Sequence, residues 1–508
     1  MTRGVTRVVS ERTVDRADID EVLLPRDGVI RERALGSGRF DVVEGPFTHY
    51  RRTVVVEHLA DGRRAHITQT VEFGLAIPYF AFLFVLPIRG QLKRIGGPTQ
   101  RFPWWSPPCR LDAGASSALG VLAAVSLVAG YLNTLLTQTI AFAADEFSAS
   151  NHAQGIAGGV VRVGGMAAFA IVALADRRGR RRLVLWTAAL GVAFSALGAL
   201  APSLAWLTAT QFLGRPFGGA LLVVIGILAV EEMPAGARAY AVSLLAMSTA
   251  LGAGICVLAL PLADIGVWGW RLLYVLPLVS LLVLPGLARN LHESRRFAVP
   301  HRDDVSLRGH GRRMVLLGVS VLLSGILVAP ASFFQNRYLR DTVGFSAARI
   351  SLFTILTNTP AGLGIVFGGR VADARGRRVV GAIGLATGAI GTAMFFRTTG
   401  WQMWWWNLAG SVFGAMSVPA LAVYGPELFP TALRGKANGL LAAIGLCGSL
   451  IGLVGVGVLS DHFDGSFATP MAIAAVAPVL VALLVLAAYP ETAQLELEQI
   501  NPEDVLRR

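Results

Sequence analysis

The chain has 508 residues, of which 54% are hydrophobic and 15% charged, and its mean hydropathy is +0.58. This composition differs from that of soluble domains and predicts an integral membrane protein. The formal net charge of +13 does not indicate nucleic-acid binding, because the positive residues lie in short loops between apolar runs and form no continuous basic face.

The N-terminal residues 1–110 are expected to form a small α+β extension on the cytoplasmic side. Residues 48–73 contain two runs of mixed polar and β-branched residues around a turn at 60–62, which predicts a β-hairpin. Residues 75–90 are apolar but short for a membrane crossing and contain two prolines, which favours an interfacial helix over a thirteenth span. A regulatory or assembly module is the favoured interpretation of this extension.

Histidine and cysteine spacing indicates no metal site and no disulfide framework. The three N-terminal histidines have no cysteine or carboxylate partners at ligand spacing. Two of the three cysteines lie in apolar runs and the third lies in a proline-rich stretch. We therefore expect no metal and no cofactor. The residues concerned are His49, His58, His66, Cys109, Cys256 and Cys447.

From Ser117 onward the chain divides into apolar runs of about 20 residues, the length that a helix needs to cross a bilayer. We expect twelve transmembrane helices and an all-α membrane protein. The approximate spans are 117–143, 155–175, 183–201, 204–230, 239–263, 270–290, 313–336, 350–372, 379–397, 401–425, 437–460 and 470–489.

Arginine is concentrated in the loops that follow even-numbered spans, and the opposite loops carry far less positive charge. Short loops rich in Arg and Lys stay in the cytoplasm. The pattern therefore predicts a multi-pass protein of the cytoplasmic membrane with both termini inside the cell. The positive groups are Arg177 to Arg182, Arg238, Arg295 to Arg313, Arg375 to Arg378, and Arg434 with Lys436.

Two loop motifs recur in the second half of the chain at matching positions. "ADRRGRR" at Ala175 returns as "ADARGRR" at Ala372, and "EEMPAGAR" at Glu231 returns as "ELFPTALR" at Glu427. Such self-similarity indicates two parallel six-helix halves. The predicted divisions are the extension 1–110, the first half 111–290, a cytoplasmic linker 291–312, the second half 313–490 and a cytoplasmic tail 491–508.

Several motifs in this order resemble the major facilitator superfamily, in particular its branch of sugar porters and organic-ion or metabolite symporters. They include "GRPFGG" in the fourth span, "WGWRLLY" entering the sixth, "YGPELFPTALRG" after the tenth and "PETAQ" after the twelfth. The resemblance implies a transporter and no enzyme activity. It implies a secondary active or facilitative carrier that exposes a central site to each side in turn.

The resemblance also implies a cytoplasmic gate, in which loop charges form a network that closes the outward-facing state. The alternative is that these residues only fix topology and cap helices. The expected gate residues are Asp176, Arg177, Gly179, Arg180, Glu231, Arg238, Glu293, Asp373, Gly376, Arg377, Glu427, Arg434 and Glu491.

The fifth span lacks the Gly-Pro pair of antiporters, which favours an importer or facilitator. "GYLNTLL" in the first span replaces an acidic sugar-porter motif, which makes a hexose substrate doubtful. A multidrug or metabolite efflux transporter and a transporter-like solute sensor remain as alternatives.

Arg162 and Arg215 lie near the middle of the second and fourth spans, whereas every Asp and Glu lies at a span edge. A buried charge is costly unless it is paired, so we expect a site for a small organic anion, such as a carboxylate. Alternatively, each arginine bonds backbone carbonyls. The lack of an embedded acid argues against proton symport, although protons remain one of the expected partners. The other expected partners are the solute and the lipid bilayer. We expect the protein to be a monomer. Neutral site residues are expected at Asn133, Gln211, Asn358, Asn407 and Tyr424.

Overall fold

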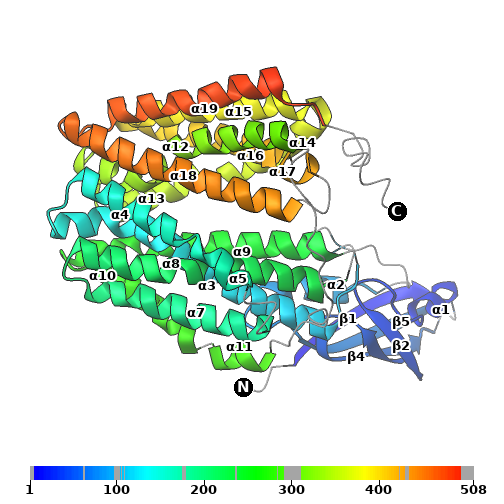
Figure 1. Ribbon diagram of the computed structural model, residues 1–508. Helices are drawn as coiled ribbons and strands as arrows, with labels where there is room; N and C mark the ends of the chain where they lie inside the picture. Colours follow the sequence, from blue (N-terminus) through cyan, green and yellow to red (C-terminus); the bar gives the residue numbers. More distant parts are fainter. Residues whose placement is uncertain are drawn as a thin grey trace.

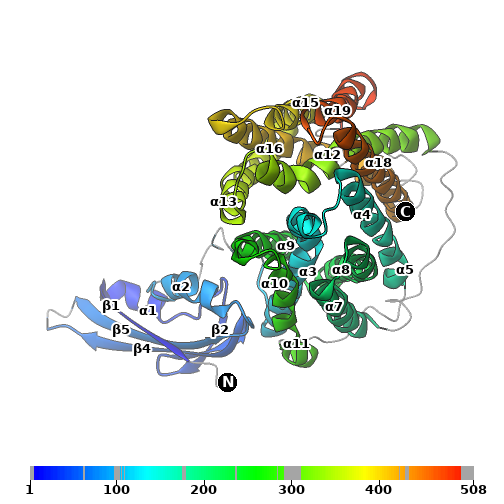
Figure 2. The ribbon, with the colours of Figure 1, turned by 90° about the vertical axis from the view of Figure 1, so that its left-hand side faces the viewer.

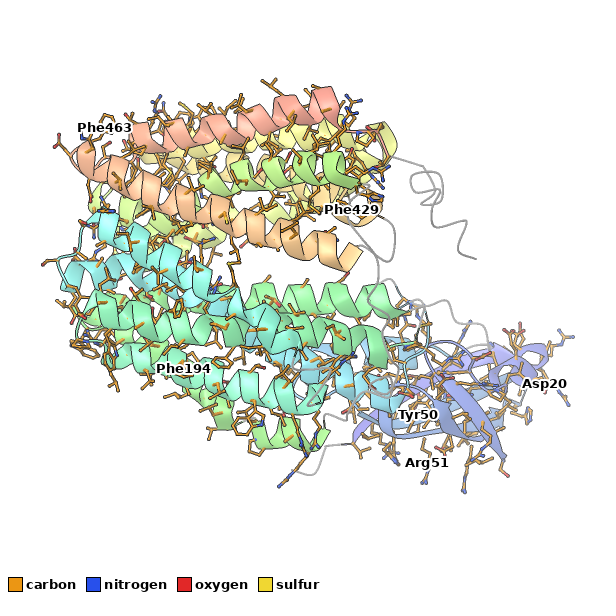
Figure 3. All side chains as sticks on the ribbon, viewed as in Figure 1. Asp20, Tyr50, Arg51, Phe194, Phe429 and Phe463 are labelled. Atoms are coloured by element: carbon orange, nitrogen blue, oxygen red, sulfur yellow. The ribbon has the colours of Figure 1, made fainter. Side chains whose placement is uncertain are left out.

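The structure is a computed structural model that describes residues 5–60, 63–95, 103, 106–107, 109–173, 179–234, 237–282, 284–290, 310–422, 424–429 and 434–492. Two groups of helices lie side by side, and a β-sheet lies at one end of them (Figure 1). We call that end of the helices the sheet end and the opposite one the far end. Phe429 marks the sheet end of the second group and Phe463 its far end (Figure 3).

The N-terminal residues form a five-stranded antiparallel sheet with strand order β1-β5-β4-β3-β2. Alternate side chains of β5 are buried, as the two-residue period of a strand requires. Two helices cover the buried face with Ile19, Val22, Ile88 and Leu92. The elements are β1 (Thr6–Asp15), η1 (Arg16–Asp18), α1 (Ile19–Val22), β2 (Arg31–Gly36), β3 (Arg39–Glu44), β4 (Phe47–His58), β5 (Arg64–Leu75) and α2 (Ala81–Leu92).

The predicted hairpin is confirmed, because β4 and β5 pair from Phe47 opposite Leu75 to His58 opposite Ala65. The sheet is larger than the hairpin, since β1, β2 and β3 extend it on both sides. The predicted apolar helix begins later than expected, at Ala81, because β5 continues to Leu75.

The first helical group follows the sheet. Its elements are α3 (Ala113–Glu146), α4 (Asn151–Gly164), α5 (Ala167–Ala173), α7 (Arg180–Ala196), η2 (Leu197–Leu200), α8 (Leu204–Glu232), α9 (Arg238–Ala259), η4 (Leu260–Ile265), α10 (Trp270–Val275), η5 (Leu276–Leu282) and α11 (Leu284–Asn290).

The second helical group begins after residue 309. Its elements are α12 (Gly311–Asp341), α13 (Ala347–Asn358), α14 (Ala361–Arg375), α15 (Arg377–Phe395), α16 (Gly400–Ala422), α17 (Tyr424–Glu427), α18 (Arg434–His462) and α19 (Ala468–Ala488).

Among the described residues, eight helices are long and apolar enough to cross a membrane. Three of the other expected spans are interrupted, which corrects their prediction as continuous helices. The span 155–175 breaks after Gly164, 270–290 breaks beside Pro277 and Pro285, and 350–372 breaks before Pro360. Proline removes a helical hydrogen bond and clashes with the preceding turn, and glycine weakens a helix interior. The remaining span, 401–425, is α16.

The two groups are packed together at the far end by α4 and α18 (Figure 2). A Cβ atom at Gly155 would lie 2.4 Å from the carbonyl oxygen of Leu453, and one at Gly457 would lie 2.8 Å from that of Asn151. Glycine is therefore required on both sides of this contact, where the two backbones touch.

Candidate functional site

Two arginines lie close together inside the first helical group. Arg215 of α8 donates a hydrogen bond from Nη1 to the carbonyl oxygen of Asn133 on α3, at 2.6 Å. Arg162 lies on the facing helix α4, and its charge acts on that of Arg215. The Asn133 amide itself donates to the carbonyl oxygen of Ala129 at 2.8 Å.

Arg162 differs from Arg215 because no hydrogen-bond or ion-pair partner lies within the described part of the chain. It is only partly buried, and it forms no hydrogen bond or ion pair with any residue that the structure describes. The acidic residues of α3, α4 and α8 occur only at helix ends. Two neighbouring cations without a carboxylate produce a positive potential that attracts an anion.

The second group contributes a polar cluster between α13 and α16. The Asn407 side chain donates from Nδ2 to Oγ1 of Thr357 at 2.7 Å and to Oδ1 of Asn358 at 3.2 Å. Ser411 donates to the carbonyl oxygen of Thr357. Asn358 and Asn407, which the sequence analysis placed in one set of site residues, thus lie in contact.

This cluster borders a cavity of about 420 Å³ that is enclosed by α12, α15, α16 and α19. Asn407, Ser411, Trp406 and Gln335 are among its lining residues. The Nε2 atom of Gln335 is buried and has no hydrogen-bond partner in the described part of the chain. Sequence reasoning missed Gln335, although an amide inside the apolar span 313–336 was a usable signal.

Gln211 and Tyr424 lie away from this cavity. Gln211 is buried on α8 and donates to the carbonyl oxygen of Ser195 at 3.4 Å. Tyr424 is buried at the sheet end, where its hydroxyl donates to the carbonyl oxygen of Pro490 at 2.9 Å and its ring packs edge-on against Tyr489. Local contacts therefore engage both side chains, and Gln211 lies one helical turn from Arg215 on α8; the assignment of these two residues to the substrate site stays a prediction.

At the sheet end, the described gate residues of the second group bind one another. Glu491 accepts hydrogen bonds from the backbone amides of Arg377 and Arg378 at the start of α15, at 3.0 and 3.3 Å. The Arg377 side chain donates to Thr492 Oγ1 at 3.0 Å. A carboxylate is stabilised at a helix N-terminus by the free amides and by the helix dipole.

Gly376 and Gly179 precede the two repeated helices in nearly the same backbone conformation. Gly376 has φ 103° and ψ 137°, and Gly179 has φ 91° and ψ 139°. Such positive φ angles favour glycine, so both copies of the loop motif make the same turn. Arg180, the next residue after Gly179, is buried.

The remaining gate residues are not described in full. Asp176, Arg177 and Glu293 lie outside the described residues. The backbones of Glu231, Arg238, Asp373, Glu427 and Arg434 are helical, and their side chains lie outside the description.

Polar residues that sequence reasoning did not assign to the site join the two helical groups at the far end. Asp461 of α18 accepts hydrogen bonds from the amides of Asn151 and His152, which begin α4, at 3.1 and 2.9 Å. Asp264 of η4 accepts from the amides of Ala347 and Ala348, which begin α13, at 2.8 and 2.9 Å. Each acid thus caps a helix of the other group.

Two further far-end contacts add to this closure. Arg340 of α12 pairs with Asp145 of α3 at 2.5 Å. The Asn336 amide donates to the Gln138 carbonyl and side-chain oxygens at 2.8 and 3.0 Å. Contacts that join the two groups at one end hold that end closed.

The chain is similar in sequence to a family of membrane transporters. The family model described as Major Facilitator Superfamily matches residues 122–334 and 316–504. A Haemophilus influenzae protein described as a metabolite transport protein is 27% identical over 345 residues, covering 63% of this chain and 82% of that protein. The sialic acid transporter NanX of Escherichia coli is 24% identical over 329 residues, covering 62% and 78% of the two chains.

The fold matches those of solved transporters. The inward-open structure of the xylose transporter XylE from E. coli superposes with a TM-score of 0.63 at 18% identity, covering 76% of this chain and 98% of that one. At this identity the likeness concerns the fold alone.

Proposed function

The chain belongs to the Major Facilitator Superfamily and is a multi-pass membrane transporter of solutes, and from that premise we propose that it carries a small organic anion by alternating access. Arg162 is the observation that carries this proposal. It is a partly exposed cation without a described partner, and it lies beside a second cation on a membrane-spanning helix.

Twelve membrane crossings in two parallel halves account best for the helices. The eight long apolar helices supply eight crossings. The pairs α4–α5 and α13–α14, the broken segment from α10 to α11, and α16 supply the other four. The matching turns at Gly179 and Gly376 support the equivalence of the halves.

Loop charge supports a cytoplasmic sheet end. Arg180 to Arg182 and Arg375 to Arg378, the described parts of the two repeated arginine motifs, lie at this end of the helices, and short basic loops remain cytoplasmic. The sheet and both chain termini are then inside the cell, in a protein of the cytoplasmic membrane. The far-end contacts of Asp461, Asp264 and Arg340 then support an inward-facing state.

In this scheme the sheet-end motifs act as the gate. Glu491 holds the amides of α15 within the second half, so it fixes the loop from which Arg377 extends. The charged residues of both loop motifs then form bonds between the halves when the sheet end closes.

We propose the charge of the solute, which is negative, and not its identity. Sialic acid, the solute in the name of one relative, is an acid and carries a carboxylate at neutral pH. A guanidinium pairs with a carboxylate through two parallel hydrogen bonds. Arg162 offers such a group beside the Asn133–Arg215 contact, and Asn358, Asn407 and Gln335 offer neutral hydrogen bonds on the opposite half.

The helices that carry Arg162 and Arg215 also bear on whether transport is coupled to protons. Acidic residues occur only at the ends of the membrane-spanning helices that carry the two arginines, and an embedded acid is the usual proton carrier in transporters. Facilitated diffusion, or coupling through the gate carboxylates, fits this arrangement. Flux measurements distinguish the alternatives. The direction of flux separates an exporter from an importer, and a sensor binds its solute without any flux.

The charge class is tested by a thermal-stability screen of the full-length protein against organic acids, sugars and amines. A ligand that binds only the folded state raises the melting temperature. We expect organic acids to do so. Arg162→Gln should weaken binding of the best acid by at least about tenfold, the equivalent of one charge-assisted hydrogen bond, with the melting temperature without ligand unchanged.

Arg349→Gln is the matched control, because Arg349 is exposed at the far end of α13. Its affinity for the acid should equal that of the unmodified protein. Stabilisation by amines alone, or equal affinities for Arg162→Gln and Arg349→Gln, would contradict the proposal. Saturable uptake of the same acid into proteoliposomes separates a transporter from a sensor.

A further inference from the structure

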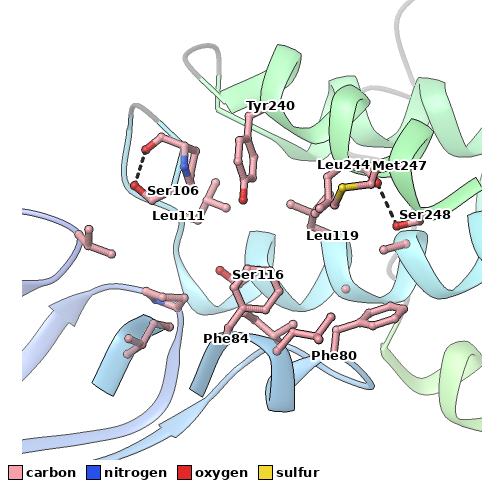
Figure 4. Close-up of a pocket in the computed structure, with 18 of the residues that line it drawn as sticks. Phe80, Phe84, Ser106, Leu111, Ser116, Leu119, Tyr240, Leu244, Met247 and Ser248 are labelled. Carbon is pink, nitrogen blue, oxygen red and sulfur yellow. Dashed lines mark hydrogen bonds between the residues drawn. The ribbon is translucent and has the colours of Figure 1, made fainter. Parts of the chain in front are cut away.

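An apolar cavity of about 130 Å³ lies where the N-terminal domain meets the helices. It is lined by the segment Ile77–Ile88 with α2, residues 106–107 and 109–111 before α3, the first turns of α3, and α9 (Figure 4), together with Val29 and Pro46. Phe80 and Phe84 lie on one side, with Leu119 and Leu244 across from them. A closed apolar cavity of 150 Å³ stays free of water and binds a benzene ring, so this space suits hydrocarbon.

One polar atom in the lining has no protein partner. The Ser116 hydroxyl lines the cavity, is buried, and forms no hydrogen bond with any described residue. Ser106 and Ser248 bind backbone carbonyls instead. The charge of Arg110, which also lines the cavity, is neutralised by Asp27 at 2.6 Å and Glu44 at 3.3 Å. The site therefore offers hydrocarbon packing and one free hydroxyl donor.

Exposed apolar side chains border the cavity, and lipid covers them in the membrane arrangement proposed above. Three of its lining side chains, Leu83 of α2 and Met247 and Leu251 of α9, are also more than half exposed. On α2 the exposed side chains change from Phe82 and Leu86 to Arg89 and Lys93 further along the same face. An apolar stretch followed by basic residues is typical of a helix that lies at the membrane interface.

We propose, on the basis of the membrane arrangement proposed above, that this cavity binds about the first six carbons of one acyl chain of a membrane phospholipid, with the ester carbonyl accepting a hydrogen bond from Ser116. Ser116 lies in the first turn of α3, and Ala123 lies two turns further from the sheet end. An acyl chain that enters beside Ser116 thus runs along α3 toward the bilayer interior. Its headgroup phosphate remains at the level of the exposed Arg89 and Lys93.

The bound chain would connect the N-terminal domain to a rigid helix pair. A Cβ at Gly130 of α3 would lie 2.0 Å from the Thr249 carbonyl oxygen of α9, so the two helices touch through their backbones. On the other side, a Cβ at Gly120 would lie 2.8 Å from Cδ of Pro78, which leads into α2. The lipid fills the space that remains between these two close contacts.

Photolabelling of the full-length protein in phospholipid nanodiscs tests the proposal. The probe is a phosphatidylcholine with a diazirine in one acyl chain, and adducts are mapped by mass spectrometry after digestion. We expect adducts on residues 116–123 of α3 and 244–251 of α9. Ala123→Phe fills the cavity with a larger side chain and should reduce these adducts to background. Ser116→Ala should reduce them about fivefold, the equivalent of one hydrogen bond.

Ala193→Phe is the matched control, because Ala193 is exposed on α7. Its adducts should equal those of the unmodified protein. Equal yields in Ala123→Phe and the control would overturn the proposal, as would adducts confined to the exposed Phe82 and Leu86. Labelling by a free diazirine fatty acid without labelling by the phospholipid would also overturn it. If Ala123→Phe does not fold, the Ser116→Ala result decides.

Discussion

Gly376 gives the second loop motif its turn, because its backbone has a positive φ angle. Its φ of 103° is rarely adopted by other residues, and a Cβ there would lie 2.8 Å from the Glu491 carboxylate. We expect Gly376→Ala to destabilise the protein by about 1–3 kcal/mol and to lower its melting temperature in detergent. Gly362→Ala is the control, since a Cβ at Gly362 meets nothing within 4 Å. Equal melting temperatures of the two variants would refute the argument.

The sequence singled out some of the polar residues inside the helices but not their contacts. It identified Arg162 and Arg215 because charges inside apolar spans are conspicuous. It did not identify the contact of Asn407 with Thr357 and Asn358, because which helix faces depend on tertiary packing. It assigned Tyr424 to the substrate site, which stays a prediction, and it did not show the contacts of Tyr424 with the aromatic ring of Tyr489 and the carbonyl of Pro490 at the sheet end. A tyrosine in a span carries no sequence signal that separates a substrate contact from a packing contact.

Within the sheet, one buried carboxylate serves two buried arginines. Glu32 pairs with Arg52 at 2.8 Å and accepts the Arg26 backbone amide at 2.9 Å, and both guanidinium groups are almost fully buried. Burial, and then the Glu32 charge, raises the pKa of Tyr50, so its phenol stays protonated and donates to Glu32 at 2.5 Å. This cluster holds β2 to β4.

We expect Glu32→Gln to destabilise the sheet by about 3–5 kcal/mol, because it leaves the buried guanidinium charge of Arg52 unpaired. Hydrogen exchange of the β4 and β5 amides should become faster, while exchange in α3 stays unchanged. Glu11→Gln is the control: Glu11 is exposed and lies 3.8 Å from His66, so its loss should change exchange little. Unchanged protection of β4 in Glu32→Gln would show that the cluster does not stabilise the sheet.

The α4–α18 contact is the element that closes the far end. Because a side chain at Gly155 would collide with the Leu453 carbonyl, Gly155→Val should separate the two helices and increase opening of the far end. We expect a cysteine introduced at buried Ser460 to react faster with a membrane-impermeant thiol reagent in this variant, in a background without native cysteines. Gly226→Val is the control, because a Cβ there meets nothing within 4 Å. Equal reaction rates would contradict this closure.

The boundaries of a strand could be predicted from the sequence where clear turn residues follow it. The hairpin of β4 and β5 was predictable from β-branched residues around a short turn. Strands β1 to β3 were not, because the alternation of apolar and polar residues is obscured where a charged residue takes a buried position, as Glu32 does in β2. The interruptions at Pro277 and Pro360 were visible in the sequence, but hydropathy alone merged each pair of segments into one span.

At the scale of the whole molecule, the two parts of the chain have separate cores. The sheet residues form clusters around Phe73 and around Ile67, whereas the helices pack around Leu135, Val224 and Tyr424. The charge and repeat patterns place both helical halves after residue 110, and that boundary stays a prediction. They did not reveal that the extension packs against α3 through Pro78 and Gly120.

Truncation tests whether these two parts fold separately. Removing residues 1–75 deletes the sheet but keeps α2 and the segment that covers α3, so we expect the melting temperature of the helical part to shift by only a few degrees. Removing residues 1–96 also deletes α2 and exposes the apolar side chains of Leu119 and Leu244, which the N-terminal segment covers. Exposed apolar patches promote association, so this longer truncation should have a lower melting temperature and aggregate sooner in size-exclusion chromatography. Equal behaviour of the two truncated proteins would show that α2 contributes nothing to the helical part, and aggregation of both would show that the sheet itself is required for its folding.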